Sequence, residues 1–134
     1  MSTVRYAIGL GCDRGTPQAT LQQAIDEALA GIGTQLAQVA AAASIDLKAD
    51  EPGLLALAAA HGWALRFYSA AQLAEVPVPH PSETVRRHTG TPSVSEAAAL
   101  LAGGGLPMAA LVVPKHKHRG ADGRHATVSI ARMS

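Results

Sequence analysis

The fold is decided by residues 4–33, whose sequence is VRYAIGLGCDRGTPQATLQQAIDEALAGIG. Apolar side chains alternate up to Leu10 and the run ends in glycine, which is typical of a buried strand. Thr16 offers a hydroxyl for a helix N-cap, Pro17 fits the first helical position, and apolar residues then recur at helical spacing. The stretch therefore predicts a strand, a tight turn and a helix.

The next part of the chain repeats this order. Strands are predicted over residues 38–45 and 63–68, each followed by a helix. The first of these helices begins at Pro52, and the second begins with a capping box formed by Ser69 and Gln72. We therefore expect parallel strands that are connected by helices.

The proline-rich segment 76–81 is predicted to be a surface connection, because prolines at this density remove backbone donors and restrict their neighbours. Residues 82–88 favour a short helix. Ser93 and Glu96 form a second capping-box pattern, which predicts a helix that runs to Ala102.

The last two strands are predicted over residues 108–113 and 126–131, and the short non-helical connection between them favours an antiparallel hairpin. The expected fold class is α/β, in three layers, with helices on both faces of a mixed sheet of about five strands. We expect this sheet to be parallel except at one edge. Residues 1–134 are expected to form a single domain.

Composition limits the function classes. No apolar run reaches the roughly 18 residues that span a bilayer, and the first residues lack a secretory signal pattern, so no membrane is expected and the cytoplasm is the expected location. Cys12 is the single cysteine, which excludes an intrachain disulfide and a thiolate-rich metal site. Only 3% of residues are aromatic, so few side chains could stack on bases and no nucleic acid is expected.

The second half of the chain is basic although the net charge is only +1. Residues 80–134 contain the cations Arg86, Arg87, Lys115, Lys117, Arg119, Arg124 and Arg132 against the acids Glu83, Glu96 and Asp122. This asymmetry indicates an anionic partner.

The first turn has the features of an anion-binding site, because it joins the carboxyl end of a strand to the amino end of a helix. Its candidate binding residues are Gly11, Cys12, Arg14, Gly15 and Thr16. No phosphate-binding or dinucleotide glycine motif is present, so no nucleotide cofactor is implied. The alternatives are a tight turn with an exposed arginine and, for Cys12, either a nucleophile or a small buried residue.

A charged stretch follows the second strand. Asp50 or Glu51 could act as a general base there, and Lys48 could act as an electrostatic clamp, with Asp46 beside them. The alternative is that Asp50 caps the following helix and the other side chains are solvated.

The run Lys115-His116-Lys117-His118-Arg119 follows the most apolar predicted strand. Its lysines disfavour a bound cation, so no metal is expected and anion binding suits the run better. The alternative is a solvated hairpin tip.

Four segments, taken in order, are similar to the C-terminal domain of the cobalamin-biosynthesis protein CbiG and its stand-alone relative CobE. They are residues 9–16, residues 44–51, residues 91–100, and residues 113–117 with residues 126–131. The resemblance covers almost the whole chain. It departs from the expected pattern at Lys115-His116-Lys117, where a central arginine is expected.

The resemblance implies a role in making the corrin ring, whose precursors carry many acetate and propionate groups. It implies a precorrin or corrin intermediate as partner and no cofactor. Full-length CbiG opens a lactone on a cobalt-precorrin and releases acetaldehyde, whereas the chain begins where the last CbiG domain begins, which favours the stand-alone form. The substrate-binding set expected from the motifs is Gly11, Cys12, Arg14, Gly15, Thr16, Asp46, Lys48, Ser93, Glu96, Lys115 and Lys117.

Three functions remain open from the sequence. The first is binding of a tetrapyrrole, with its carboxylates held by lysine and arginine side chains and by the first turn. The second is hydrolysis of a precorrin lactone, with Asp50 or Glu51 activating water. The third is an accessory subunit that works beside another enzyme of the pathway.

Overall fold

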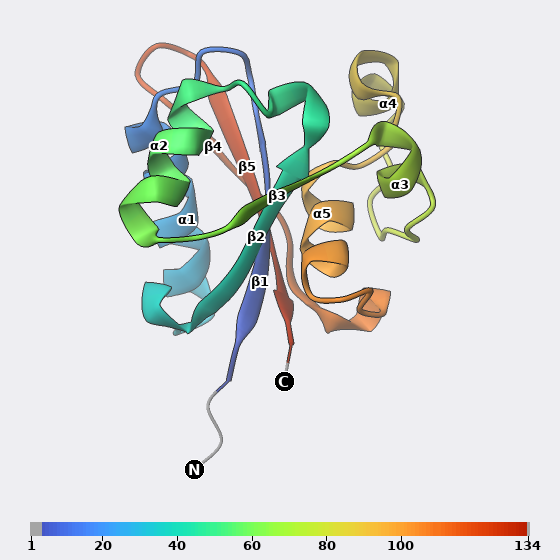
Figure 1. The fold of residues 1–134 in the computed structure, drawn as a ribbon, viewed down its shortest axis with the longest axis horizontal. Coiled ribbons are helices and arrows are strands. Elements are labelled where there is room, and N and C mark those ends of the chain that lie inside the picture. The colour runs from blue at the N-terminus through green and yellow to red at the C-terminus, as the bar shows by residue number, and fades with distance from the viewer. Residues whose placement is uncertain (1–3, 134) are drawn as a thin grey trace.

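The computed structural model describes residues 4–133. Its sheet has the strand order β3-β2-β1-β5-β4 and lies between two layers of helices (Figure 1). The strands are β1 (Tyr6–Cys12), β2 (Val39–Ile45), β3 (Leu65–Tyr68), β4 (Leu111–Arg119) and β5 (His125–Arg132). The helices are α1 (Gln18–Gly31), α2 (Pro52–His61), α3 (Ala70–Ala74), α4 (Glu83–Thr89) and α5 (Ser95–Ala102), with short 3-10 helices η1 (Leu36–Gln38), η2 (Asp46–Lys48) and η3 (Met108–Ala110).

The sheet is mixed, as predicted, but its antiparallel strand is in the interior. β1, β2 and β3 are parallel, and β5 runs antiparallel to both of its neighbours, β1 and β4. The prediction of a sheet that is parallel except at one edge was therefore wrong. The reason is that β5 is largely buried, whereas β4 carries Pro114 and a run of basic residues, which an edge strand tolerates.

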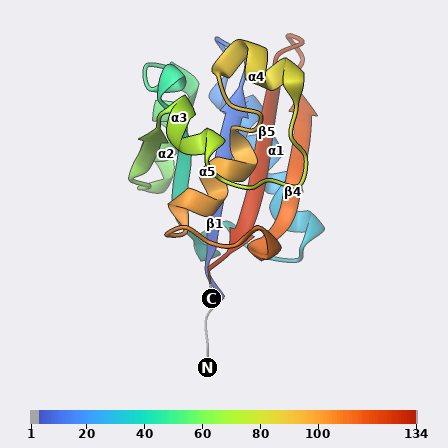
Figure 2. The same ribbon diagram turned by 90° about the vertical axis from the view of Figure 1, so that its right-hand side faces the viewer.

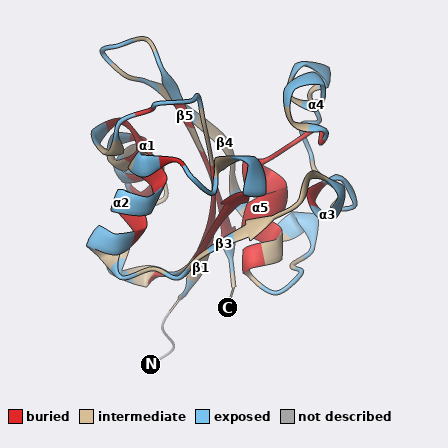
Figure 3. Ribbon diagram, turned by 45° about the horizontal axis from the view of Figure 1, so that its top comes forward, coloured by how far each residue is buried: buried red, intermediate tan, exposed pale blue. Residues whose placement is uncertain are grey.

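The two faces of the sheet pack differently. Large aliphatic side chains such as Ile8, Leu21 and Leu54 fill the space between the sheet and the pair α1 and α2. On the other face, α5 approaches so closely that a Cβ atom on Gly9 would lie 1.9 Å from the Ser95 carbonyl oxygen. This face therefore depends on small residues, and α5 is almost entirely buried (Figure 3).

Two expected helix caps do not form. α1 begins at Gln18 with Pro17 as its N-cap, and the Thr16 hydroxyl instead donates to the Asp13 carbonyl oxygen at 2.7 Å. α5 begins at Ser95, and its N-cap residue, Val94, forms no side-chain cap hydrogen bond. The expected capping box of Ser93 and Glu96 is therefore absent. The polar side chains near these helix starts are used in tertiary contacts instead.

The predicted hairpin is confirmed, but the basic run is part of a strand and not its tip. Residues 108–110 form η3, and β4 extends from Leu111 through Arg119 with an irregular register between Val113 and His116. Because side chains alternate along a strand, Lys115 and Lys117 face one side of the sheet and the histidines between and after them face the other. Figure 2 shows β4 at the edge of the sheet, with α3, α4 and α5 in front.

Candidate functional site

The carboxyl ends of β1 and β2 border a pocket of about 460 Å³, which we call the strand-end pocket. Ligands of open α/β sheets bind outside the carboxyl ends of the strands, at the point where the order of the strands in the sheet reverses. The residues that line the pocket are Gly11, Cys12, Asp13, Ile45, Lys48, His80, Pro81, Ser82, Thr84, Val85, His88, Thr89, Val94, Ser95, Lys115, Lys117, His125 and Thr127. Segments that are distant in the sequence therefore build one site.

Lysine side chains give the strand-end pocket a positive character. Lys48 enters from η2, whereas Lys115 and Lys117 enter from the edge strand β4. Within residues 4–133, neither Lys48 nor Lys117 forms a salt bridge. The acid in the lining, Asp13, is already bound to His125, whose backbone N–H donates to Asp13 Oδ2 at 2.8 Å. The ammonium groups of Lys48 and Lys117 are thus available to bind an anion.

Cys12 lines the strand-end pocket but is poorly suited to nucleophilic attack. Burial, together with the negative charges of Glu51 and Asp13, raises the pKa of its thiol to about 11, although Lys48 acts in the opposite direction. A thiol with this pKa is protonated at neutral pH, and only the thiolate is a strong nucleophile. The structure supports the interpretation of Cys12 as a small, half-buried residue.

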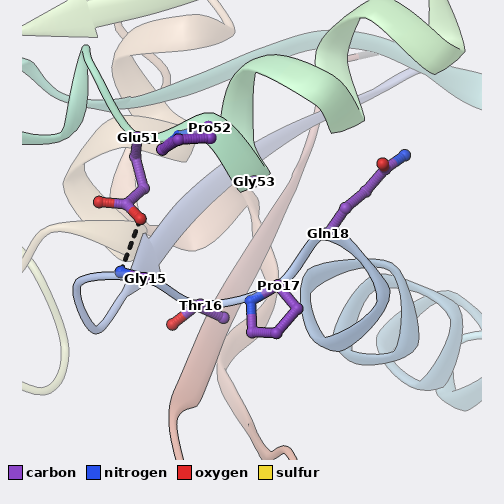
Figure 4. Close-up of a pocket in the computed structure, with 7 residues that line it drawn as sticks. All are labelled: Gly15, Thr16, Pro17, Gln18, Glu51, Pro52 and Gly53. Atoms are coloured by element: carbon purple, nitrogen blue, oxygen red, sulfur yellow. Dashed lines mark hydrogen bonds between the residues drawn. The ribbon is translucent and has the colours of Figure 1, made fainter.

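The first turn holds an anion, and the anion is a side chain of the protein itself. Glu51 is 2% exposed, and its Oε1 atom accepts a hydrogen bond from the Gly15 backbone N–H at 2.7 Å (Figure 4). Arg14 donates to Asp50 at 2.7 Å, to Glu51 at 3.2 Å, and to the Leu47 carbonyl oxygen. We call Arg14, Gly15, Asp50 and Glu51 the closed cluster.

The closed cluster gives its acids a structural task. The Arg14 hydrogen bond holds the pKa of the Asp50 carboxyl below its ordinary value. Asp50 does not cap α2, whose N-cap is Glu51 with no side-chain cap bond. A smaller pocket of about 330 Å³ between the starts of α1 and α2 is lined by Gly15, Thr16, Pro17, Gln18, Glu51, Pro52 and Gly53. The predicted base role of Asp50 or Glu51 stays a prediction that these contacts do not favour.

A second buried acid lies beneath the strand-end pocket. Glu96 is 0% exposed, and its carboxylate accepts hydrogen bonds from Ser93 Oγ at 3.2 Å and from His80 Nδ1 at 3.1 Å. Lys115 Nζ lies 4.0 Å from Glu96 Oε1 and donates to the His80 carbonyl oxygen at 3.0 Å. These polar partners offset the cost of burying a carboxylate. They also tie the proline-rich segment to β4 and α5.

The structure divides the residues expected from the sequence into three groups. Gly11, Cys12, Lys48, Lys115 and Lys117 line the strand-end pocket, and Ser93 and Glu96 lie beneath it. Arg14, Gly15, Thr16, Asp50 and Glu51 lie in or beside the closed cluster. Asp46 is exposed at the start of η2.

His80 is not among the site residues predicted from the sequence, because the proline-rich segment gives no sign of where it lies in the fold. The sequence does contain a useful signal at Glu96, the hydrogen-bond partner of His80. Glu96 is an acid in an otherwise apolar and alanine-rich stretch, and such an acid needs a buried partner if the stretch is core. The partner's identity depended on the path of the chain over α5.

The opposite face of β4 carries a separate charged cluster. Glu27 of α1 lies 2.8 Å from His116 Nε2 and 3.3 Å from His118 Nδ1. The His116 hydrogen bond lowers the pKa of Glu27. In the part of the chain that the structure describes, residues 4–133, no group of three or more His, Cys, Asp or Glu side chains is arranged to hold a metal ion. Nor does that part contain a helix that is both long enough and apolar enough to cross a membrane.

Residues 6–131 match the model of the family described as cobalamin synthesis G C-terminus, CbiG_C. The chain is 42% identical over 98 residues to a cobalt-precorrin-5A hydrolase from Priestia megaterium, which covers 73% of this chain and 26% of that protein. It therefore spans about a quarter of that relative's length. It is 37% identical over 126 residues to Protein CobE from a Sinorhizobium species, which covers 92% of this chain and 77% of the relative.

Solved structures agree with these similarities. The crystal structure of CobE, described as a protein from the cobalamin (vitamin B12) biosynthetic pathway, has a TM-score of 0.78 at 32% identity and covers 98% of this chain and 95% of its own. That of the cobalamin biosynthesis protein chiG from Agrobacterium tumefaciens has a TM-score of 0.66 at 31% identity, with 96% and 98% covered. The resemblance predicted from four segments is confirmed. The chain belongs to the cobalamin synthesis G C-terminus family and is a protein of cobalamin biosynthesis.

Proposed function

We propose that the protein binds a polycarboxylate tetrapyrrole, a precorrin or corrin intermediate, with one edge of the ring in the strand-end pocket. The observation that carries this proposal is the pair Lys48 and Lys117, which face one pocket from opposite sides without a salt bridge in the described chain. Two ammonium groups set apart in this way suit two carboxylates on the periphery of a rigid ring.

Apolar surface supports the same ligand class. Ile45, Val85 and Val94 line the pocket among the polar groups. A corrin ring offers an apolar edge with charged substituents, so it can use both kinds of lining. The pocket volume of about 460 Å³ accommodates part of such a ring and leaves the rest outside.

The experiment is a titration of the protein with hydrogenobyrinic acid, followed through the visible absorption of the corrin. We expect Lys48→Ala and Lys117→Ala each to weaken binding about tenfold, since each removes one charge-assisted hydrogen bond of about 1.4 kcal/mol. Arg66→Ala is the matched control, because Arg66 is an exposed cation on β3 outside the pocket. Binding by the double lysine variant with unchanged affinity would refute the proposed site.

The name of the relative from Priestia megaterium raises hydrolysis as a second function. The buried carboxylate of Glu96 next to His80 favours this possibility for the present chain. A histidine oriented by a carboxylate is a common arrangement for proton transfer. An accessory role beside another enzyme of the pathway remains compatible with ligand binding, and retention of hydrogenobyrinic acid by the isolated chain would show that binding needs no second protein.

A further inference from the structure

His80 has a hydrogen-bonding pattern that is typical of a metal-binding histidine. Its Nδ1 atom bonds to the Glu96 carboxylate at 3.1 Å, and that carboxylate is 0% exposed. Among residues 4–133, no group forms a hydrogen bond with the other ring nitrogen, Nε2. Histidines that bind metal ions commonly donate one ring N–H to a carboxylate, which orients the ring and makes the other nitrogen a better electron-pair donor.

Two sets of contacts hold the His80 imidazole in one orientation. A carboxylate oxygen only accepts hydrogen bonds, so in the neutral ring the proton lies on Nδ1 and the lone pair lies on Nε2. Ser93 Oγ donates to the second oxygen of Glu96 at 3.2 Å, which fixes the carboxylate. Lys115 Nζ donates to the His80 carbonyl oxygen at 3.0 Å, which fixes the main chain. His80 therefore presents an oriented nitrogen with a free lone pair.

The other histidines in the lining of the strand-end pocket, His88 and His125, lack this support. His125 Nδ1 lies 3.3 Å from Asp13 Oδ2, but the two side chains are 50% and 57% exposed. Water competes for an exposed pair, so the pair orients its ring weakly. Within the described residues, His88 forms no hydrogen bond with a carboxylate. Among these three histidines, His80 alone has a buried carboxylate partner.

The surroundings of His80 do not suit a free metal ion. Over residues 4–133, no three His, Cys, Asp or Glu side chains are grouped to hold one, and lysines line the same pocket. A metal ion that is already bound in a tetrapyrrole has a different requirement. The ring nitrogens are its equatorial ligands, and only an axial position is open to the protein. One oriented histidine is sufficient for that position.

The place of His80 in the fold agrees with such a ligand. The connection between α3 and α4 carries His80 across α5 to β4 (Figure 2). The His80 side chain is 61% exposed although it lines the strand-end pocket, so it lies at the pocket mouth. A ring whose edge carboxylates are bound to Lys48 and Lys117 has its centre farther out than that edge, toward this mouth.

We propose that His80 Nε2 is an axial ligand of a cobalt ion carried by the tetrapyrrole in the strand-end pocket, with Glu96 as its positioning residue. The protein then prefers the cobalt form of its ligand to the metal-free ring. This proposal rests on the proposed function, because the ring must first be bound there.

The ligand exchange is balanced without an oxidant or a reductant. The lone pair of His80 Nε2 forms a bond to cobalt, and one axial water leaves the metal. No proton is released, because this nitrogen is unprotonated in the tautomer that Glu96 selects. The same lone pair cannot accept a proton while it binds cobalt, so ligation excludes the proton transfer considered above in the same complex.

The test compares hydrogenobyrinic acid, which has no metal, with cobyrinic acid, which has the same peripheral carboxylates and carries cobalt. Both are titrated into the full chain and followed by visible absorption. We expect the wild type to bind cobyrinic acid about a hundredfold more tightly, and His80→Gln to lose this preference while it keeps its affinity for hydrogenobyrinic acid. For Glu96→Gln we expect the preference to fall about tenfold. His61→Gln on α2 is the control, because His61 lies outside the pocket.

Electron paramagnetic resonance of the cobalt(II) form identifies the ligand directly. One bound nitrogen splits the high-field cobalt lines into triplets, and labelling histidine with the heavy nitrogen isotope changes the triplets into doublets. We expect this pattern in the wild type and in His61→Gln, and we expect it to be absent in His80→Gln. A purely structural role of His80 would leave the splitting in place.

The outcomes separate this inference from the proposed function. Splitting that persists in His80→Gln, or that is lost in His125→Gln instead, would overturn the assignment of the ligand. If the wild type binds both rings equally well and shows no nitrogen splitting, this inference fails and the proposed function stands. If the wild type binds neither ring, both fail.

Discussion

The closed cluster and the strand-end pocket share one edge of the sheet, yet their charges are arranged in opposite ways. In the closed cluster, the groups that could hold a ligand anion, Arg14 and the Gly15 N–H, are already bound to Glu51. In the strand-end pocket, Lys48 and Lys117 have no salt-bridge partner within the described residues. The same elements of anion recognition therefore stabilise the fold in one place and remain available in the other.

This difference shows how far a sequence pattern identifies a binding site. A glycine-containing turn between a strand and a helix favours an anion, because backbone N–H groups are unpaired there. The pattern does not say whether the anion is a ligand or a side chain. Here the loop before α2 supplies Glu51, so the first turn is a structural site and binding is expected beside it.

The substitution Gly9→Ala tests the strand-end pocket and has the largest expected effect. Its methyl group would lie 1.9 Å from the Ser95 carbonyl oxygen, so the start of α5 and the pocket floor must move. We expect a loss of about 3 kcal/mol in the free energy of unfolding, measured with urea, and weaker binding of hydrogenobyrinic acid. Gly31→Ala is the control, because no atom outside its own turn of α1 lies within 4 Å of the added Cβ. Equal stability of the two variants would contradict the close contact of α5 with β1.

The substitution Glu51→Ala tests the closed cluster. It leaves the Gly15 N–H and Arg14 without their buried acceptor. We expect a loss of about 2 kcal/mol in the free energy of unfolding, with little change in the affinity for hydrogenobyrinic acid. Glu75→Ala, at an exposed position after α3, serves as the matched control. Loss of binding at full stability would instead make Glu51 part of the ligand site.

Lowering the pH tests the Arg14–Asp50 pair of the closed cluster, and its expected effect on stability is the smallest of the three. The Arg14 hydrogen bond lowers the pKa of Asp50 below its ordinary 3.8. Since this pKa is lower in the folded than in the unfolded chain, the pair stabilises the fold above the unfolded value and loses that contribution as pH falls through the folded value. Urea unfolding of wild type and Asp50→Asn should differ by a constant amount above about pH 5, and the difference should shrink as pH falls below 3.8 and through the lower pKa of the folded state. The exposed Asp46→Asn is the control, and a difference for Asp50→Asn that persists in acid would refute the role of the pair.

Local signals located most of the helices and strands. Alternation predicted β1, and the expected box of Ser69 and Gln72 caps α3. The left-handed glycines Gly62 and Gly90 end α2 and α4. These features depend on neighbours in the chain, so the sequence contains their cause. The expectations that failed concerned polar side chains at the starts of helices. Thr16 and Glu96 resemble capping residues, but Thr16 donates to the Asp13 and His125 carbonyl oxygens and Glu96 bonds to His80. Only the folded chain brings His125 and His80 near these side chains.

The sequence by itself determined the α/β class, the hairpin, the basic second half and, through four ordered segments, the family. These follow from periodicity, turn chemistry and composition, which are local or additive properties. The tertiary structure alone decided that β5 lies inside the sheet, that Glu51 fills the first turn, and that His80 meets Glu96. The physical reason is that a charge acts on whatever lies within a few ångströms of it, and the neighbours of a buried charge are chosen by packing and chain path.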